Sequence, residues 1–314
     1  MSRWQVALNS KLEEYRAQLT RKHRQEATIS EYERIVWNAF EAFSAAGLSR
    51  YPRSIGADEI AFLQDELYAH MEPLTARNQV AMVGMFLKRC GNPIVESLDL
   101  EWPVDMRRHV KWLDPMKAMK LMRSAQGMER ILIHCELCLL MRRVEVKRAE
   151  VRDFRDGRLD VWGKGRNGGK PRTIPWHPRT AEELDYYLRL REEVNVAAME
   201  FTAPLPEALL VYATPQRVGA YADTAIDGMI KKAAGRAGLA PDEVSNHVLR
   251  RTGARILKRA GVPLITIMQT LGHLTEKQTL DYIGEDLEEM ATGMELSEAY
   301  MRKLECTGDG TKRD

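Results

Sequence analysis

Long apolar runs and aromatic residues are scarce in this 314-residue chain. Aromatic residues make up 7% of the sequence, and no window approaches the ~18 consecutive apolar residues of a membrane-spanning helix. This excludes an integral membrane protein, and we expect a soluble, helix-rich protein without a membrane partner. The first residues also lack an apolar signal region, so we expect it to be cytoplasmic, and nucleoid-associated when on DNA.

Cysteines, phosphate-binding loops and acidic metal sites are also rare. Of the four cysteines, Cys135 and Cys138 have metal-like spacing, but no second pair follows. The apolar run of residues 131–140 indicates a buried helix in which cysteine acts as a small apolar residue, in preference to zinc or redox chemistry. The sequence holds no P-loop and no carboxylate cluster suited to magnesium, so we expect no cofactor and no metal.

The net charge of +2 is small, but the charges are unevenly distributed. Residues 141–173 hold eleven Lys or Arg against five acids, and residues 247–259 hold five basic residues and no acid. Residues 284–300 hold six acids and no Lys or Arg. This distribution suits a polyanion-binding face with a tail that packs on protein, and solvated helix faces are the alternative.

The first hundred residues predict a helical module without a cluster of catalytic residues. Apolar residues recur at helical spacing over residues 4–19. Thr28 and Glu31 form a capping-box pattern that opens a second helix, residues 60–67 carry a third, and Thr75 caps a fourth.

The helical pattern breaks at residues 106–115, which we interpret as an interdomain linker. It separates an N-terminal domain, residues 1–105, from a second domain, residues 116–314, which ends in an acidic and apolar tail over residues 284–314. The second domain combines helical periodicity with short strand-like segments around glycine-rich turns, which predicts a mainly α fold with a small antiparallel β-sheet. The expected helices are 116–125, 128–141, 180–194, 222–237, 247–260, 264–271 and 276–283, and the expected strands are 151–154, 159–162 and 172–174.

Near the C-terminus, four side chains suggest phosphate chemistry. His247 and Arg250 stand three apart on one helix, so both can reach a single phosphate. Arginine's planar fork matches phosphate oxygens and keeps its charge. Gly272 lets the backbone turn so that His273 points to the same place, and Tyr282 follows on the next helix. A phenol needs such positive surroundings to attack a phosphodiester.

Arg142, three residues before Glu145, and Lys164, in a Gly-Lys-Gly turn, precede this run. Together these residues resemble the signature of the tyrosine recombinase (phage integrase) family, of the Xer-like or archaeal type. The likeness covers about residues 110–290. It implies six catalytic residues: Arg142, Lys164, His247, Arg250, His273 and the nucleophile Tyr282.

The chain departs from the family pattern at three positions. The family's first box usually reads Gly-Leu-Arg, whereas this chain has Leu140, Met141 and Arg142. Lys147 stands where leucine is common, and Arg251 replaces a frequent second histidine. None of the three changes removes an expected catalytic group.

The resemblance implies a two-domain DNA clamp, in which a helical core-binding domain precedes the catalytic domain. The enzyme would be a metal- and ATP-independent site-specific recombinase that cleaves and rejoins DNA through a 3′-phosphotyrosyl intermediate. Arg142 and Arg250 would neutralise the phosphate, Lys164 would protonate the leaving 5′-oxygen, His247 would assist proton transfer, and His273 would hydrogen-bond the phosphate. A type IB topoisomerase-like activity and a non-catalytic DNA-binding protein of the same fold are the alternatives.

The expected partners are double-stranded DNA and further copies of the chain, as a tetramer on two DNA sites. An accessory DNA-bending or directionality factor, the target site, the biological role (integration, excision or resolution) and packing of the tail in cis or in trans are left open. Further DNA contacts are expected from Arg143, Arg166, Lys170, Arg172 and Arg251.

Overall fold

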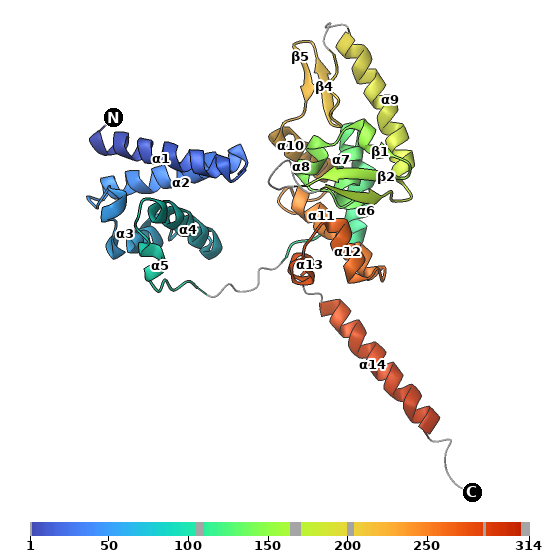
Figure 1. The fold of residues 1–314 in the computed structure, drawn as a ribbon. Helices are drawn as coiled ribbons and strands as arrows, with labels where there is room; N and C mark the ends of the chain where they lie inside the picture. Colours follow the sequence, from blue (N-terminus) through green and yellow to red (C-terminus); the bar gives the residue numbers. More distant parts are fainter. Residues whose placement is uncertain (1, 104–109, 164–170, 200–203, 285–286, 309–314) are drawn as a thin grey trace. The chain divides into compact units, whose positions relative to one another are not determined.

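The computed structural model describes residues 2–103, 110–163, 171–199, 204–284 and 287–308. The described residues up to 103 form one compact unit, and those from 110 onward form a second (Figure 1). Among the described helices, none is long and apolar enough to span a membrane.

The first unit is helical, as the apolar spacing predicts. Its core contains Tyr15, Phe40, Phe43 and Phe86, and the ring of Phe40 meets those of Phe43 and Phe86 edge to face at centroid distances of 5.5 and 5.9 Å. Aromatic contacts of this kind bury large apolar areas and fix how the helices pack. Its helices are α1 (Arg3–Arg21), α2 (Glu26–Ala45), η1 (Pro52–Ser54), α3 (Ala57–Phe62), η2 (Leu63–Leu67), α4 (Pro73–Arg89) and α5 (Ile94–Ser97).

Two predicted helix starts in this unit are wrong. Helix α2 begins at Glu26 rather than at Thr28, and α4 begins at Pro73 rather than at Thr75. The fixed φ of proline suits the first helical position, and proline lacks the N–H that would need a partner there. The first turn of α4 therefore forms without a side-chain cap.

The second unit contains the predicted helices, but the strand expected over residues 151–154 is wrong. Residues 151–153 form the 3₁₀ helix η3, because the Asp153 carboxylate accepts from the Glu150 N–H at 2.8 Å and closes a turn, and β1 covers only Phe154–Arg155. The helix expected over residues 128–141 ends at Leu137, and those expected at 264–271 and 276–283 have the predicted bounds. The elements are α6 (Pro115–Ser124), α7 (Met128–Leu137), α8 (Arg143–Arg148), η3 (Val151–Asp153), β1 (Phe154–Arg155), β2 (Arg158–Trp162), β3 (Pro171–Pro175), α9 (Thr180–Met199), β4 (Val211–Thr214), β5 (Arg217–Ala220), α10 (Asp223–Arg236), α11 (Asn246–Arg259), α12 (Leu264–Leu271), α13 (Glu276–Ile283) and α14 (Leu287–Gly308).

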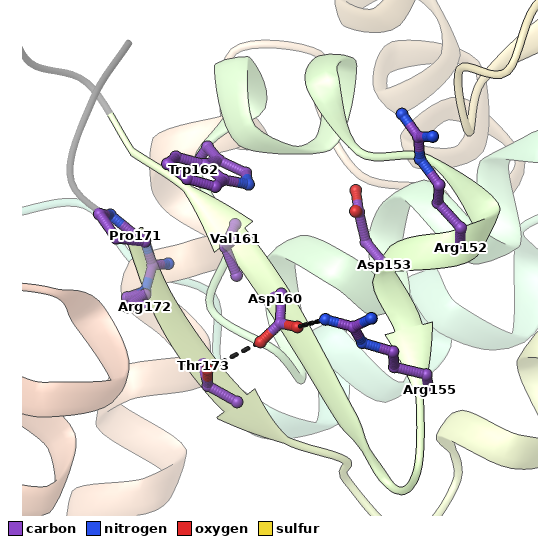
Figure 2. A pocket seen from close by; sticks show the side chains of 9 residues that line it. All are labelled: Arg152, Asp153, Arg155, Asp160, Val161, Trp162, Pro171, Arg172 and Thr173. Atoms are coloured by element: carbon purple, nitrogen blue, oxygen red, sulfur yellow. Dashed lines mark hydrogen bonds and ion pairs between the residues drawn. The ribbon is translucent and has the colours of Figure 1, made fainter. Parts of the chain in front are cut away.

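The predicted three-stranded sheet is antiparallel, in the order β1-β2-β3. Asp160 pairs with Thr173 on the outer face, where Asp160 also accepts hydrogen bonds from Thr173 Oγ1 (2.7 Å) and from Arg155 (2.9 Å). These residues line a pocket of about 730 Å³ beside the exposed Trp162 (Figure 2). Arg172 also lines this pocket, and its guanidinium donates to Glu145.

The sequence reading missed a second sheet, the hairpin of β4 and β5. It lies beside α9 in Figure 1. The ring of Tyr212 in β4 lies 5.1 Å from that of Tyr221, which follows β5, and Arg217 lies over the Tyr212 ring. These cross-strand contacts stabilise the hairpin once the strands pair, and the sequence spacing of the residues does not reveal them.

Helices α7 and α11 form the centre of the second unit. A Cβ added at Gly253 of α11 would lie 1.9 Å from the Leu137 carbonyl oxygen and 2.6 Å from Leu140 Cδ2. The two backbones therefore touch at a position where no larger residue fits. Cys135 is fully buried in α7, and burial raises the pKa of its thiol, as expected for a structural cysteine.

Candidate active site

The described residues bring five of the six predicted catalytic positions into one unit. Arg142 lies between α7 and α8, His247 and Arg250 lie on α11, His273 follows α12, and Tyr282 lies in the last turn of α13. Lys164 lies outside the described residues.

Arg250 is held in a fixed orientation by the backbone. Ser245 caps the start of α11 by accepting a hydrogen bond from the Val248 N–H, and this places Arg250 on the buried side of the helix, 2% exposed. Its guanidinium donates to the carbonyls of Leu140 and Leu271. Burial, followed by the nearby Arg142, lowers the pKa of Arg250 to about 9, so it remains charged at neutral pH.

Glu145 connects three arginines. Its carboxylate accepts from the Arg142 backbone N–H (2.7 Å) and Nη1 (2.8 Å), and from both terminal nitrogens of Arg172 (2.6 and 2.8 Å). Arg250 Nη1 lies 3.6 Å away. Burial alone would raise the pKa of Glu145, but the hydrogen bonds and charges of Arg172, followed by Arg142 and Arg250, hold it at about 2. The Glu145 carboxylate therefore stays ionised and orients the guanidinium groups of Arg142 and Arg172.

The unusual first box has a structural explanation. Leu140 occupies the position where the family usually has glycine, and its φ is +51°, in the left-handed region that glycine adopts without strain. Its side chain is fully buried in a cluster with Ala254, Ile267, Leu271 and Ile283. Burial of the leucine side chain beneath α11, α12 and α13 therefore offsets the unfavourable left-handed backbone conformation.

Replacing Leu140 tests whether burial of its side chain offsets the backbone strain. Glycine relieves strain of about 1–2 kcal/mol but removes a buried side chain worth about 2–5 kcal/mol. We therefore expect Leu140→Gly to lower the free energy of unfolding by about 1–3 kcal/mol in urea titrations. Leu140→Ala keeps the strain and should be about 1 kcal/mol less stable than Leu140→Gly. A glycine variant as stable as the native chain, or less stable than the alanine variant, would contradict this explanation.

His273 is placed by a left-handed turn. Gly272 has a φ of +63° and ends α12, and a Cβ there would lie 3.0 Å from Arg172 Cδ. His273 Nδ1 lies 3.1 Å from the hydroxyl of Thr279, a partner that the sequence reading missed. Burial, followed by the charges of Arg250 and Arg142, lowers the pKa of His273 to about 4, so it is neutral at pH 7.

Tyr282 lies among these groups. Its hydroxyl donates to the His247 backbone carbonyl at 3.3 Å, and its ring meets that of His273 edge to face at 5.2 Å. The guanidinium carbons of Arg250 and Arg251 lie 5.9 and 5.0 Å from the ring centroid. Burial raises the pKa of Tyr282, although both arginines oppose this, so the phenol is protonated at neutral pH.

The additional basic residues expected to contact DNA differ in their surroundings. Arg143 pairs with Asp227 at 2.7 Å. The side chain of Arg172 is 12% exposed and faces Glu145 rather than solvent, and Arg251 donates to two backbone carbonyls. Lys164, Arg166 and Lys170 lie outside the described residues. Their contacts with DNA stay predictions.

The arrangement concentrates positive charge around one phenol. Within the described ranges, no group of three or more His, Cys, Asp or Glu side chains is placed to hold a metal ion. Arginines, a histidine and a tyrosine arranged in this way can bind an anion and supply a nucleophile. His247 is exposed on the same helix as Arg250, and its backbone carbonyl accepts from Tyr282.

Comparisons with known proteins identify the family and the fold. The profile of the phage integrase family matches residues 111–289. A solved structure of XerH site-specific recombinase bound to palindromic difH substrate, a post-cleavage complex, is 18% identical, covering 87% of this chain and 80% of its own, with a TM-score of 0.63. A lambda integrase(75-356) dimer bound to a COC' core site is 17% identical, with 88% and 95% covered and a TM-score of 0.61. Among curated proteins, none matches the chain.

Proposed function

Because this chain belongs to the phage integrase family, we propose that it is a site-specific DNA recombinase that cleaves and rejoins strands through Tyr282. The observation that carries the proposal is the position of the Tyr282 phenol beside the Arg250 guanidinium and the neutral His273, with Arg142 and Arg250 both next to the Glu145 carboxylate. Phosphoryl transfer depends mainly on positioning and on neutralising charge at the phosphate, and these groups supply both.

In the proposed reaction, the Tyr282 oxygen forms a bond to the scissile phosphorus while the bond to the 5′-oxygen breaks. The products are a 3′-phosphotyrosyl enzyme and a free 5′-hydroxyl, and attack by a 5′-hydroxyl on another strand reverses the step. Arg142 and Arg250 neutralise the non-bridging oxygens. Arg250 has five N–H groups and uses two of them on carbonyls, so others are available to the phosphate.

The structure describes the surroundings of Tyr282 and His273, and the proposed proton-transfer roles of His247 and Lys164 come from the family resemblance. The Tyr282 hydroxyl donates to the His247 carbonyl here, so it must turn away from that carbonyl to reach a phosphate. His247 then assists loss of the phenol proton, and Lys164 protonates the 5′-oxygen. The single proton of the Thr279 hydroxyl can go to the Thr275 carbonyl (3.3 Å) or to His273 Nδ1 (3.1 Å). The proposed role of His273 requires the second arrangement, because neutral His273 then carries its proton on Nε2 and can donate it to the phosphate.

The proposed partner is double-stranded DNA, bound by both compact units. A lambda integrase tetramer bound to a Holliday junction is among the similar structures, with 18% identity, 89% and 78% covered and a TM-score of 0.59. We extend that assembly to four copies of this chain on two DNA sites. Met294, Leu296, Tyr300 and Met301 of α14 are exposed, and either cis or trans packing would cover them.

A strand-exchange assay separates this function from its alternatives. The DNA that flanks this protein's own gene is placed twice on one supercoiled plasmid and incubated with the protein. A recombinase yields deletion or inversion between the two copies. Relaxation without a site preference would indicate a type IB topoisomerase-like activity, and tight binding with unchanged DNA would indicate a non-catalytic protein.

A further inference from the structure

Two arginines on α11 hold the end of the nucleophile helix by its backbone. Arg251 Nε donates to the Tyr282 carbonyl at 2.8 Å, and Arg255 Nη1 donates to the Ile283 carbonyl at 3.0 Å. The last carbonyls of a helix have no partner within the helix, so these bonds fix the final turn of α13. Arg255 is only 2% exposed, which places this contact inside the domain.

The same side chains hold the segment of residues 110–113. Arg251 Nη1 donates to the Lys111 carbonyl at 3.1 Å, and the Arg255 guanidinium lies 3.6 Å from the centre of the Trp112 ring. Between them on α11, the Thr252 hydroxyl accepts from the Leu113 N–H at 2.8 Å. A buried cation–π contact at this distance is among the stronger of its kind.

The two held segments also touch each other. Gly284 has a φ of +79°, and a Cβ at that position would lie 2.9 Å from Val110 Cβ. Residues 110–113 are the first described residues after the first compact unit, and residues 282–284 complete the helix that carries the nucleophile. One face of α11 therefore fastens both segments together.

We propose that Arg251 and Arg255 form a linker clip that sets the position of Tyr282 according to the position of residues 110–113. This rests on the proposed cleavage by Tyr282 and makes both arginines positioning residues. While Arg251 and Arg255 make these contacts, the final turn of α13 cannot rotate without breaking their interactions with residues 110–113. Arg251 was expected to contact DNA, and in the structure two of its N–H groups donate to the carbonyls of Tyr282 and Lys111.

Kinetics at saturating DNA distinguish positioning from binding. Misplacing a reacting group by about 1 Å can slow a reaction by roughly 100-fold. We therefore expect Arg251→Ala and Trp112→Ala each to lower the single-turnover rate of covalent adduct formation by roughly 10- to 100-fold, with DNA affinity within about threefold. Lys232→Ala, which removes an exposed charge from α10, is the matched control and should behave as the native chain.

Combining the changes tests whether the two residues act through one clip. The Arg251→Ala/Trp112→Ala double variant should lose little more rate than either single variant, because groups that act as a unit are not additive. A rate that falls by the product of the two single effects would overturn the clip. Weaker DNA binding with an unchanged rate at saturation would overturn the clip and indicate that Arg251 contacts DNA directly.

Hydrogen exchange tests the clip without relying on catalysis. In the full-length chain, Trp112→Ala should speed amide exchange in peptides covering residues 276–284 by roughly tenfold or more, and leave α10 unchanged. Unchanged exchange in α13 would overturn the clip, whatever the activity of the protein. A native chain that forms no adduct would instead count against the proposed function, so the two failures are distinguishable.

Discussion

Arg250→Ala is expected to lower the rate of DNA cleavage by about 1000-fold or more, because removing one preorganised donor to a reacting oxyanion typically costs 100- to 1000-fold. Arg250 is also the most deeply buried cation near the phenol, where charge is least screened by water. DNA affinity should change far less, since it is distributed over many phosphate contacts. Single-turnover adduct formation and a binding titration at the same salt concentration measure the two effects.

Arg142→Ala is the companion variant for this test. Arg142 donates to the Glu145 carboxylate, and its side chain is 26% exposed. Its removal should disturb the fold less than removal of Arg250, because loss of Arg250 also leaves the Leu140 and Leu271 carbonyls without that donor. Both variants should lose cleavage with DNA binding largely retained. Loss of binding in proportion to the loss of cleavage would contradict the catalytic assignment.

The second large effect is on stability. Gly253→Ala should destabilise the second unit by about 3–5 kcal/mol, because the new Cβ would lie 1.9 Å from the Leu137 carbonyl oxygen and backbone cannot move aside as a side chain can. For a unit of this size, that corresponds to a fall in Tm of about 10 °C or more. Differential scanning calorimetry measures it directly. Because α11 carries His247 and Arg250, cleavage should fall too.

Gly228→Ala provides the matched control. Gly228 lies inside α10, and a Cβ there meets nothing within 4 Å. Alanine favours a helix interior over glycine by about 1 kcal/mol, so this variant should be as stable as the native chain or slightly more so. Equal stability of both variants would mean that α7 and α11 do not touch at Gly253.

The sequence predicted local structure best where local signals decide it. The bounds of α12 and α13 follow from an apolar stripe, the Thr275 cap that accepts from the Gln278 N–H, and glycines beyond each C-terminus. The predicted starts of α2 and α4 were wrong, because Thr28 and Thr75 lie in the first turn of these helices, where the sequence pattern of a threonine cap looks the same. The β4–β5 hairpin was missed because its stabilising contacts form only after the strands pair.

In the candidate site, too, residue spacing predicted some features, and contacts that depend on packing were missed. The spacing of His247, Arg250, His273 and Tyr282 pointed to one cluster, and the described structure places these residues on α11, after α12 and on α13. Arg172 was expected to contact DNA, and the spacing gave no sign that it reaches Glu145 from β3, because that contact depends on how a strand and a helix pack. Likewise, the left-handed Leu140 becomes interpretable only through the cluster that buries its side chain.

The most direct test of the account is an SDS-stable adduct assay on supercoiled DNA that carries the sequence flanking this protein's gene. Native protein and Tyr282→Phe are compared side by side, without ATP and with EDTA. The account predicts a covalent protein–DNA band with the native chain alone, mapped by peptide sequencing to Tyr282. An equal band with Tyr282→Phe, or no band from native protein that binds and recombines this DNA, would contradict it.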